Sequence, residues 1–183
     1  GMLLGGAFTS AIGYHITDSM LLALFTGVAG GLIVAGVQAE MSHRLSADQF
    51  VVGLTLNILV FGLAGFLDNE IQPETKLAGK WEIPLLSDIP KIGEIFFQHS
   101  LPVYVAFALV PVVWFMINKT TFGLNIRAVG ETPEAADTLG VSVNKTRTFT
   151  ILIGNMMAGL AGGALALEVG IFQQNLTAGQ GFI

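Results

Sequence analysis

Two asparagines of this sequence lie inside long stretches that carry no charged residue, which is a demanding place for a polar side chain. Asn57 falls within residues 49–67 and Asn155 within residues 148–167. A carboxamide both donates and accepts hydrogen bonds, and polar groups at membrane depth usually face the interior of a helix bundle. We therefore take both as candidates for lining the path of a neutral solute. The alternative, that each amide only bonds a neighbouring helix, stays open at this point.

Aromatic and amide side chains elsewhere could add to such a path. Phe8 and Phe61 could stack on a base or a sugar ring, and the run 173–175 supplies Gln173 and Asn175 as hydrogen-bonding groups. The combination suits a solute that bears hydroxyls or a base. The phenylalanines could equally face lipid.

Other kinds of chemistry lack their usual residues. The carboxylates that would carry ions through a secondary transporter stand at the ends of the uncharged stretches, at Asp18, Glu40, Asp68 and Glu168. The histidines that could serve an intramembrane enzyme, His15, His43 and His99, are far apart, and the chain has no cysteine. No Gly-x-x-x-x-Gly-Lys-Ser/Thr phosphate loop occurs, and the glycines at 159–163 are expected to pack helices together. These patterns argue against an ion-coupled transporter, an enzyme and a nucleotide site, and no cofactor or metal is expected.

Composition says which elements must position these residues. Of 183 residues, 52% are hydrophobic and 11% are charged, against roughly 25% charged in soluble domains. A helix of about 20 residues crosses the hydrocarbon core. Four uncharged stretches are that long, and we expect complete spans at 20–38, 50–67, 101–118 and 148–167, with partial spans at both ends. The predicted fold class is an all-α, polytopic transmembrane helix bundle, with Gly27 and Gly31 placed for close helix contact.

The basic residues predict which loops face the cytoplasm. Five of the eight are expected on one side because they flank or lie near the ends of the spans: Arg44, Lys119, Arg127, Lys145 and Arg147. The positive-inside rule then places residues 119–147 in the cytoplasm and the acidic, proline-rich segment 68–94 outside. The net charge of −5 argues against a nucleic-acid polymer as partner.

A short helix is expected within the cytoplasmic segment. Thr132 is placed to cap it, Pro133 suits its first position, Glu134 complements its dipole, and Gly140 is placed to end it. Ser142 could cap the following span. Such a short helix needs a surface to lean on, and its apolar side, Ala135, Ala136 and Leu139, would fit a groove. It could transmit motion from a cytoplasmic partner, or it could rest on the lipid.

A resemblance favours the first of these interpretations. The stretch Gly-Leu-Asn-Ile-Arg-Ala-Val-Gly-Glu at 123–131, then Pro-Glu-Ala-Ala at 133–136 and Leu-Gly-Val at 139–141, resembles the coupling segment of ATP-binding-cassette importer permeases of the branched-chain amino acid, sugar and nucleoside family. The blocks 1–8, 47–57 and 175–183 resemble the nucleoside and simple-sugar branch of that family. The implied coupling residues are Arg127, Gly130, Glu131, Pro133, Glu134, Ala135, Ala136, Leu139 and Gly140.

The resemblance also implies an assembly. Residues 1–183 would form one transmembrane permease domain, an internal fragment of a longer protein in the cytoplasmic membrane of a prokaryote. It would work with two cytoplasmic ATP-binding-cassette ATPase subunits, a second permease copy or paralogue, and an external solute-binding lipoprotein, all in the lipid bilayer. The solute would be a nucleoside or simple sugar, with branched-chain amino acids as the alternative.

Overall fold

The structure, a computed structural model, describes residues 1–44, 48–71, 80–82, 98–173 and 176. Most of these residues form seven helices: α1 (Met2–Thr17), α2 (Met20–Arg44), α3 (Gln49–Ile71), α5 (Leu101–Lys119), α6 (Thr121–Glu131), α7 (Pro133–Thr138) and α8 (Val143–Val169). Two three-residue strands, β1 (Lys80–Glu82) and β2 (Gln98–Ser100), pair in antiparallel register. The predicted helical fold class is confirmed, while the strand pair and the helix α6 are features that the sequence patterns did not predict.

Four helices, α2, α3, α5 and α8, are long and apolar enough to cross a membrane. They coincide with the four predicted spans, but each extends past its uncharged stretch because helix continues through the flanking polar residues. The partial span expected at the start corresponds to α1. The one expected at the other end falls mostly outside the described residues, and residues 170–173 there are not helical.

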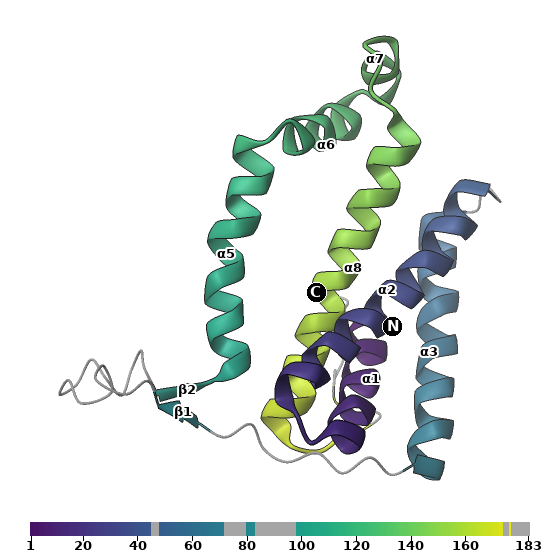
Figure 1. Ribbon diagram of the computed structural model, residues 1–183. Helices are drawn as coiled ribbons and strands as arrows, with labels where there is room; N and C mark the ends of the chain where they lie inside the picture. Colours follow the sequence, from purple (N-terminus) through teal and green to yellow (C-terminus); the bar gives the residue numbers. More distant parts are fainter. Residues whose placement is uncertain (45–47, 72–79, 83–97, 174–175, 177–183) are drawn as a thin grey trace.

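Figure 1 shows which ends of the long helices lie at the same end of the bundle. The end of α2, the start of α3, and α6 with α7 lie toward one end of the bundle, and the α1–α2 turn, the end of α3 and the strand pair lie toward the other. The α1–α2 turn is tight, because Asp18 adopts the left-handed conformation (φ 51°) and donates its N–H to the Tyr14 carbonyl. The chain thus reverses its direction between α1 and α2.

Helices α1, α2 and α8 form a close three-helix core in which glycines replace side chains. A β-carbon on Gly6 would lie 2.3 Å from the Gly159 carbonyl oxygen, and one on Gly31 would lie 2.5 Å from the Asn155 carbonyl oxygen. The backbones of three helices therefore touch, as small residues permit in membranes. The packing role expected for Gly27, Gly31 and Gly159 is confirmed.

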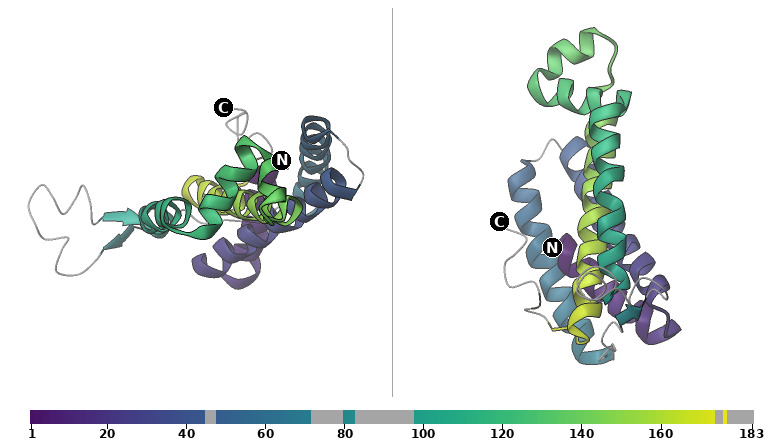
Figure 2. Two further views of the ribbon diagram at one scale, coloured as in Figure 1. Left: turned by 90° about the horizontal axis from the view of Figure 1, so that it is seen from above. Right: turned by 90° about the vertical axis from the view of Figure 1, so that its left-hand side faces the viewer.

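The remaining long helices join this core unequally. Helix α3 packs on it through the side chains of Val60 and Ala64, which share a buried cluster with α1. Helix α5 meets it mainly near its start, where Leu101 and Val105 pack against the cluster around Leu167. Figures 1 and 2 show α5 standing apart from α8 toward the end where α6 connects them.

Candidate functional site

The segment from α5 to α8 forms a frame at one end of the molecule. Helix α6 runs across from the end of α5, and α7 turns the chain back into α8 (Figure 2). The two long helices of this frame are both candidate membrane spans. The segment 121–138 therefore lies just beyond the ends of two spans, as the sequence predicted for the coupling segment.

The corner between α5 and α6 is fixed by polar contacts and one glycine. The Thr120 hydroxyl accepts from the Gly123 N–H at 3.2 Å, and the Arg127 guanidinium donates to the Ile117 carbonyl at 2.7 Å. A β-carbon on Gly123 would lie 2.0 Å from that same carbonyl oxygen, so only glycine fits this corner. Arg127, predicted as a coupling residue, thus binds the last turn of α5 and ties α6 to it.

Helix α7 ends in the manner that its glycine predicted. Gly140 has φ +85°, its N–H donates to the Asp137 carbonyl at 2.9 Å, and the Val141 N–H donates to the Ala136 carbonyl at 3.0 Å. This pair of bonds is a Schellman motif, which satisfies the last carbonyls of a helix. The six-residue length agrees with the short helix that was expected.

The predicted cap residues of α7 and α8 are in place, but their side chains do not cap the helices. Thr132 and Ser142 do occupy the cap positions of α7 and α8, but neither side chain makes a capping hydrogen bond. The reason at Thr132 is local, since its own N–H closes α6 by bonding the Ala128 carbonyl. Thr132 therefore ends α6 and begins α7, with φ −141° and ψ 87°, and its hydroxyl accepts no hydrogen bond from the first turn of α7.

The exposed face of α7 differs from the predicted one. Ala136, expected to enter a partner's groove, is only 2% exposed and is therefore already buried within this chain. Leu139, by contrast, is 84% exposed beside the exposed Ala135 and Glu134. Gly130 and Glu131 are also exposed, and Pro133 is partly buried. The surface that residues 130–140 offer to a partner therefore carries acidic side chains beside the exposed Leu139.

The two predicted amides bind partners within the bundle. The Asn57 side-chain oxygen accepts from the Gly1 nitrogen at 2.5 Å, joining α3 to the start of the chain. The Asn155 amide donates to the side-chain oxygen of Gln38 at 3.0 Å, joining α8 to α2. Gln38 is a site residue that the sequence analysis missed. The predicted span 20–38 ended at this residue, whereas α2 continues for six further residues.

The other predicted path residues do not gather in one place. Phe8 is 6% exposed and packs edge-to-face on Phe172, with ring centroids 5.1 Å apart, so it belongs to the core. Phe61 is 47% exposed on α3 and Gln173 is exposed after α8. Asn175 lies outside the described residues.

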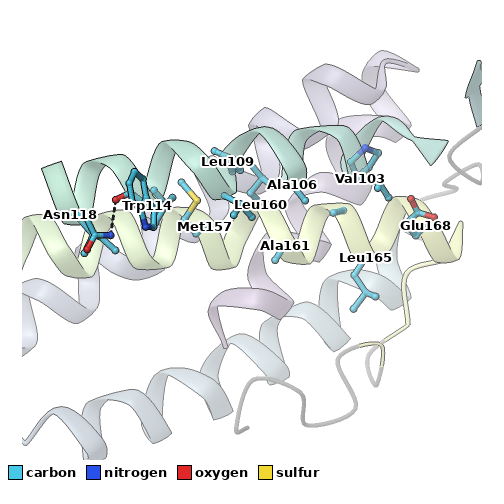
Figure 3. A pocket seen from close by; sticks show the side chains of 15 residues that line it. Val103, Ala106, Leu109, Trp114, Asn118, Met157, Leu160, Ala161, Leu165 and Glu168 are labelled. Carbon is cyan, nitrogen blue, oxygen red and sulfur yellow. Dashed lines mark hydrogen bonds between the residues drawn. The ribbon is translucent and has the colours of Figure 1, made fainter. Parts of the chain in front are cut away.

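A groove of about 800 Å³ separates α5 from α8 (Figure 3). Its walls are apolar, with Leu109 and Ala106 facing Leu160 and Ala161, while Asn118 lies toward one end and Glu168 toward the other. The Glu168 carboxylate accepts a hydrogen bond from the Ser100 hydroxyl, which links the start of α5 to the end of α8. The predicted path residues are not among those that line this groove, so it offers little to a polar solute.

Comparisons with known proteins point to one family. The family described as branched-chain amino acid transport system / permease component matches residues 1–183. A nucleoside ABC transporter permease protein of Lactococcus lactis subsp. cremoris is 36% identical over 196 residues, covering 100% of this chain and 62% of that protein.

Two further relatives agree with this. A guanosine ABC transporter permease protein of Bacillus subtilis is 35% identical, covering 100% of this chain and 62% of that protein. A putative glucose ABC transporter permease protein of Haloferax volcanii is 35% identical, covering 100% of this chain and 57% of that protein. The chain thus spans about 60% of the length of these relatives. No solved structure matches it significantly.

Proposed function

The chain belongs to the branched-chain amino acid transport system permease family, and on that premise we propose that it forms part of the membrane-spanning permease of an ATP-binding-cassette importer for a nucleoside or a simple sugar. The observation that carries the proposal is the match of the family to all of residues 1–183. The solute class rests on relatives whose names specify a nucleoside, guanosine and glucose, at 35–36% identity.

The importer would work in the cytoplasmic membrane of a prokaryote as a multi-subunit complex. Two ATP-binding-cassette subunits on the cytoplasmic side would hydrolyse ATP, and a solute-binding lipoprotein would deliver solute from outside. A second permease copy or paralogue would complete the pathway through the bilayer. This chain would contribute helices of the pathway and the segment that receives motion from the ATPase.

The α6–α7 segment is the part that we assign to ATPase coupling. Its exposed surface combines Glu131, Glu134 and Leu139, beyond the ends of two spans. A complementary surface on the ATPase would offer an apolar pocket for Leu139 and basic residues for the two carboxylates. Ala136, since it is buried, would act by holding α7 in position.

Reconstituted transport tests the proposed function. The full-length permease, co-expressed with its ATPase and placed in proteoliposomes, is expected to import guanosine or glucose only with ATP and the binding protein. Uptake that needs neither the ATPase nor ATP, and that stops when a proton gradient is dissipated, would instead identify an ion-coupled transporter. ATP-dependent uptake of leucine with neither of the other solutes would move the protein to the branched-chain amino acid group.

A surface variant tests the coupling assignment. Leu139→Arg places a charge where an apolar contact is expected, at a cost of desolvation on binding. Because the side chain is 84% exposed, the permease itself should fold and insert normally. We expect the ATPase to be lost on co-purification or to lose its stimulation by solute, whereas the control Leu139→Met keeps both. An Arg variant with normal association and uptake would remove α7 from the coupling role.

A further inference from the structure

The amide pair formed by Gln38 and Asn155 has hydrogen-bonding groups to spare. The two side chains share one hydrogen bond, from the Asn155 amide nitrogen to the Gln38 side-chain oxygen at 3.0 Å. Two carboxamides together offer four N–H donors and two carbonyl acceptors. Within the described part of the chain, the N–H groups of Gln38 and the side-chain carbonyl of Asn155 make no other hydrogen bond.

Both side chains are accessible, Asn155 within its span and Gln38 close to the end of its own. Gln38 and Asn155 are each half-buried, and each stands inside a candidate span, Met20–Ser42 and Val143–Val169 respectively. Asn155 is 12 residues from the start of α8, which corresponds to about 18 Å along the helix. Polar groups with spare hydrogen-bonding capacity are costly against acyl chains, so accessible ones in a span are expected to face water, a cavity or a solute.

The amide bond is not the only contact that joins the two helices. Helix α2 already meets α8 backbone to backbone, since a β-carbon on Gly31 would lie 2.5 Å from the Asn155 carbonyl oxygen and 2.9 Å from the α-carbon of Gly159. Figure 1 shows α2 and α8 adjacent there and separating toward the end that carries α7. The pair therefore stands beside a close backbone contact between the same two helices, so their association does not rest on the amides alone.

We propose that Gln38 and Asn155 form a solute-recognition site that binds the hydrogen-bonding edge of a nucleobase during transport. The free amide N–H groups of Gln38 and the free carbonyl of Asn155 supply a donor and an acceptor on neighbouring side chains. The edge of guanine that carries O6 and N1–H presents the complementary acceptor and donor. Carboxamides pair with a purine in the same way, through one donated and one accepted hydrogen bond, at N7 and N6 of adenine in nucleic-acid complexes. This inference rests on the proposed importer function and assigns the base, rather than the sugar, to this part of the path.

The test uses the full-length permease with its ATPase and binding protein in proteoliposomes. ATP-driven uptake is measured with guanosine, with 1-methylguanosine, whose base edge is blocked by a methyl group, and with glucose. Solute concentrations saturate the binding protein, so that its own selectivity no longer affects the rate. The variants are Gln38→Leu and Asn155→Leu, and the matched control is Asn69→Leu, an exposed amide on α3 that bonds only the Gly65 carbonyl of its own helix within the described residues.

Selectivity is the readout that a merely structural role would not change. The wild-type and Asn69→Leu proteins should transport guanosine faster than 1-methylguanosine. Either pair variant should slow guanosine about three- to tenfold, the effect of one lost hydrogen bond, and should bring the rates of the two solutes together. Abundance and detergent stability of the variants should match the wild type.

Four results would overturn the inference. Variants that lose stability and transport of both nucleosides in equal proportion would make the pair a structural link, and variants with wild-type selectivity would remove it from the path. A wild type that imports glucose but no nucleoside would refute base recognition while leaving the importer function intact. A wild type with no ATP-dependent import of any of the three would refute both the inference and the proposed function.

Discussion

A single methyl group on α8 should measure how closely the three core helices are packed. Gly162 lies against the backbone of α1, where a β-carbon would be 1.9 Å from the Leu3 carbonyl oxygen and 2.9 Å from the Ala7 nitrogen. Ordinary contact begins near 3.4 Å. Gly162→Ala therefore requires α1 and α8 to separate by the difference between 3.4 and 1.9 Å, about 1.5 Å at this level.

The cost of that separation can be isolated with a control on the same helix. The atoms in the way are backbone atoms, so no side-chain rotation relieves the clash, and overpacking of this kind costs about 1–3 kcal/mol. Alanine also favours the helix over glycine by about 1 kcal/mol, which partly offsets the loss. Gly154→Ala receives only that benefit, because no atom lies within 4 Å of its β-carbon position. The difference in unfolding free energy between the two variants should be about 1–3 kcal/mol.

The assay is denaturant unfolding of the purified full-length permease in detergent micelles, followed by tryptophan fluorescence. Gly162→Ala should unfold at a lower denaturant concentration than the wild type, and Gly154→Ala at the same or a higher one. Equal midpoints for the two alanine variants would refute the backbone contact between α1 and α8. In Gly159→Ala the β-carbon would lie 2.6 Å from the Gly27 carbonyl oxygen. A midpoint for this variant equal to that of Gly154→Ala would refute the backbone contact between α2 and α8.

Three other predictions concern the coupling segment, the topology and the path. Gly140→Ala places a side chain at φ +85°, which costs about 1–2 kcal/mol, so protease cleavage near α7 should accelerate and ATPase stimulation should fall; unchanged cleavage would contradict the strain. Glu70 and Thr138 are both exposed and can each be replaced by a single cysteine. An impermeant thiol reagent applied to intact cells should label the cysteine at 70 and not the one at 138, and the reverse pattern would invert the topology. Asn57→Leu should reduce uptake at wild-type abundance if Asn57 lines the path, whereas lower stability by about 1 kcal/mol with normal uptake per molecule would make it a helix link.

The sequence predicted the spans well because their signal is local. An uncharged stretch of about 20 residues has one physical solution in a bilayer, a helix, and all four predicted stretches are helical. The ends were less predictable. Helix α2 passes Glu40 and continues to Arg44, because backbone hydrogen bonding continues through polar residues where the interface provides water.

The site was predicted less completely, since its geometry depends on contacts between distant segments. Asn155 was identified, but its partner lies 117 residues away and carries no local signal. Ala136 was assigned to the outer face of α7 from its size, although the six-residue helix turns that methyl group inward and Leu139 outward. A helix this short has too few residues for periodicity to indicate which face is buried.

Helix α8 connects the two proposed sites. It runs unbroken from Val143, next to α7, through Asn155 to its glycine contact with α1 and α2. The Asn155 carbonyl itself lies against Gly31 in that contact, so the amide pair stands where the closely packed part of α8 begins. Between α7 and Asn155 lie 12 residues of continuous helix. A movement of α7 driven by the ATPase would therefore reach the amide pair through this helix and act on the bond between Asn155 and Gln38 of α2.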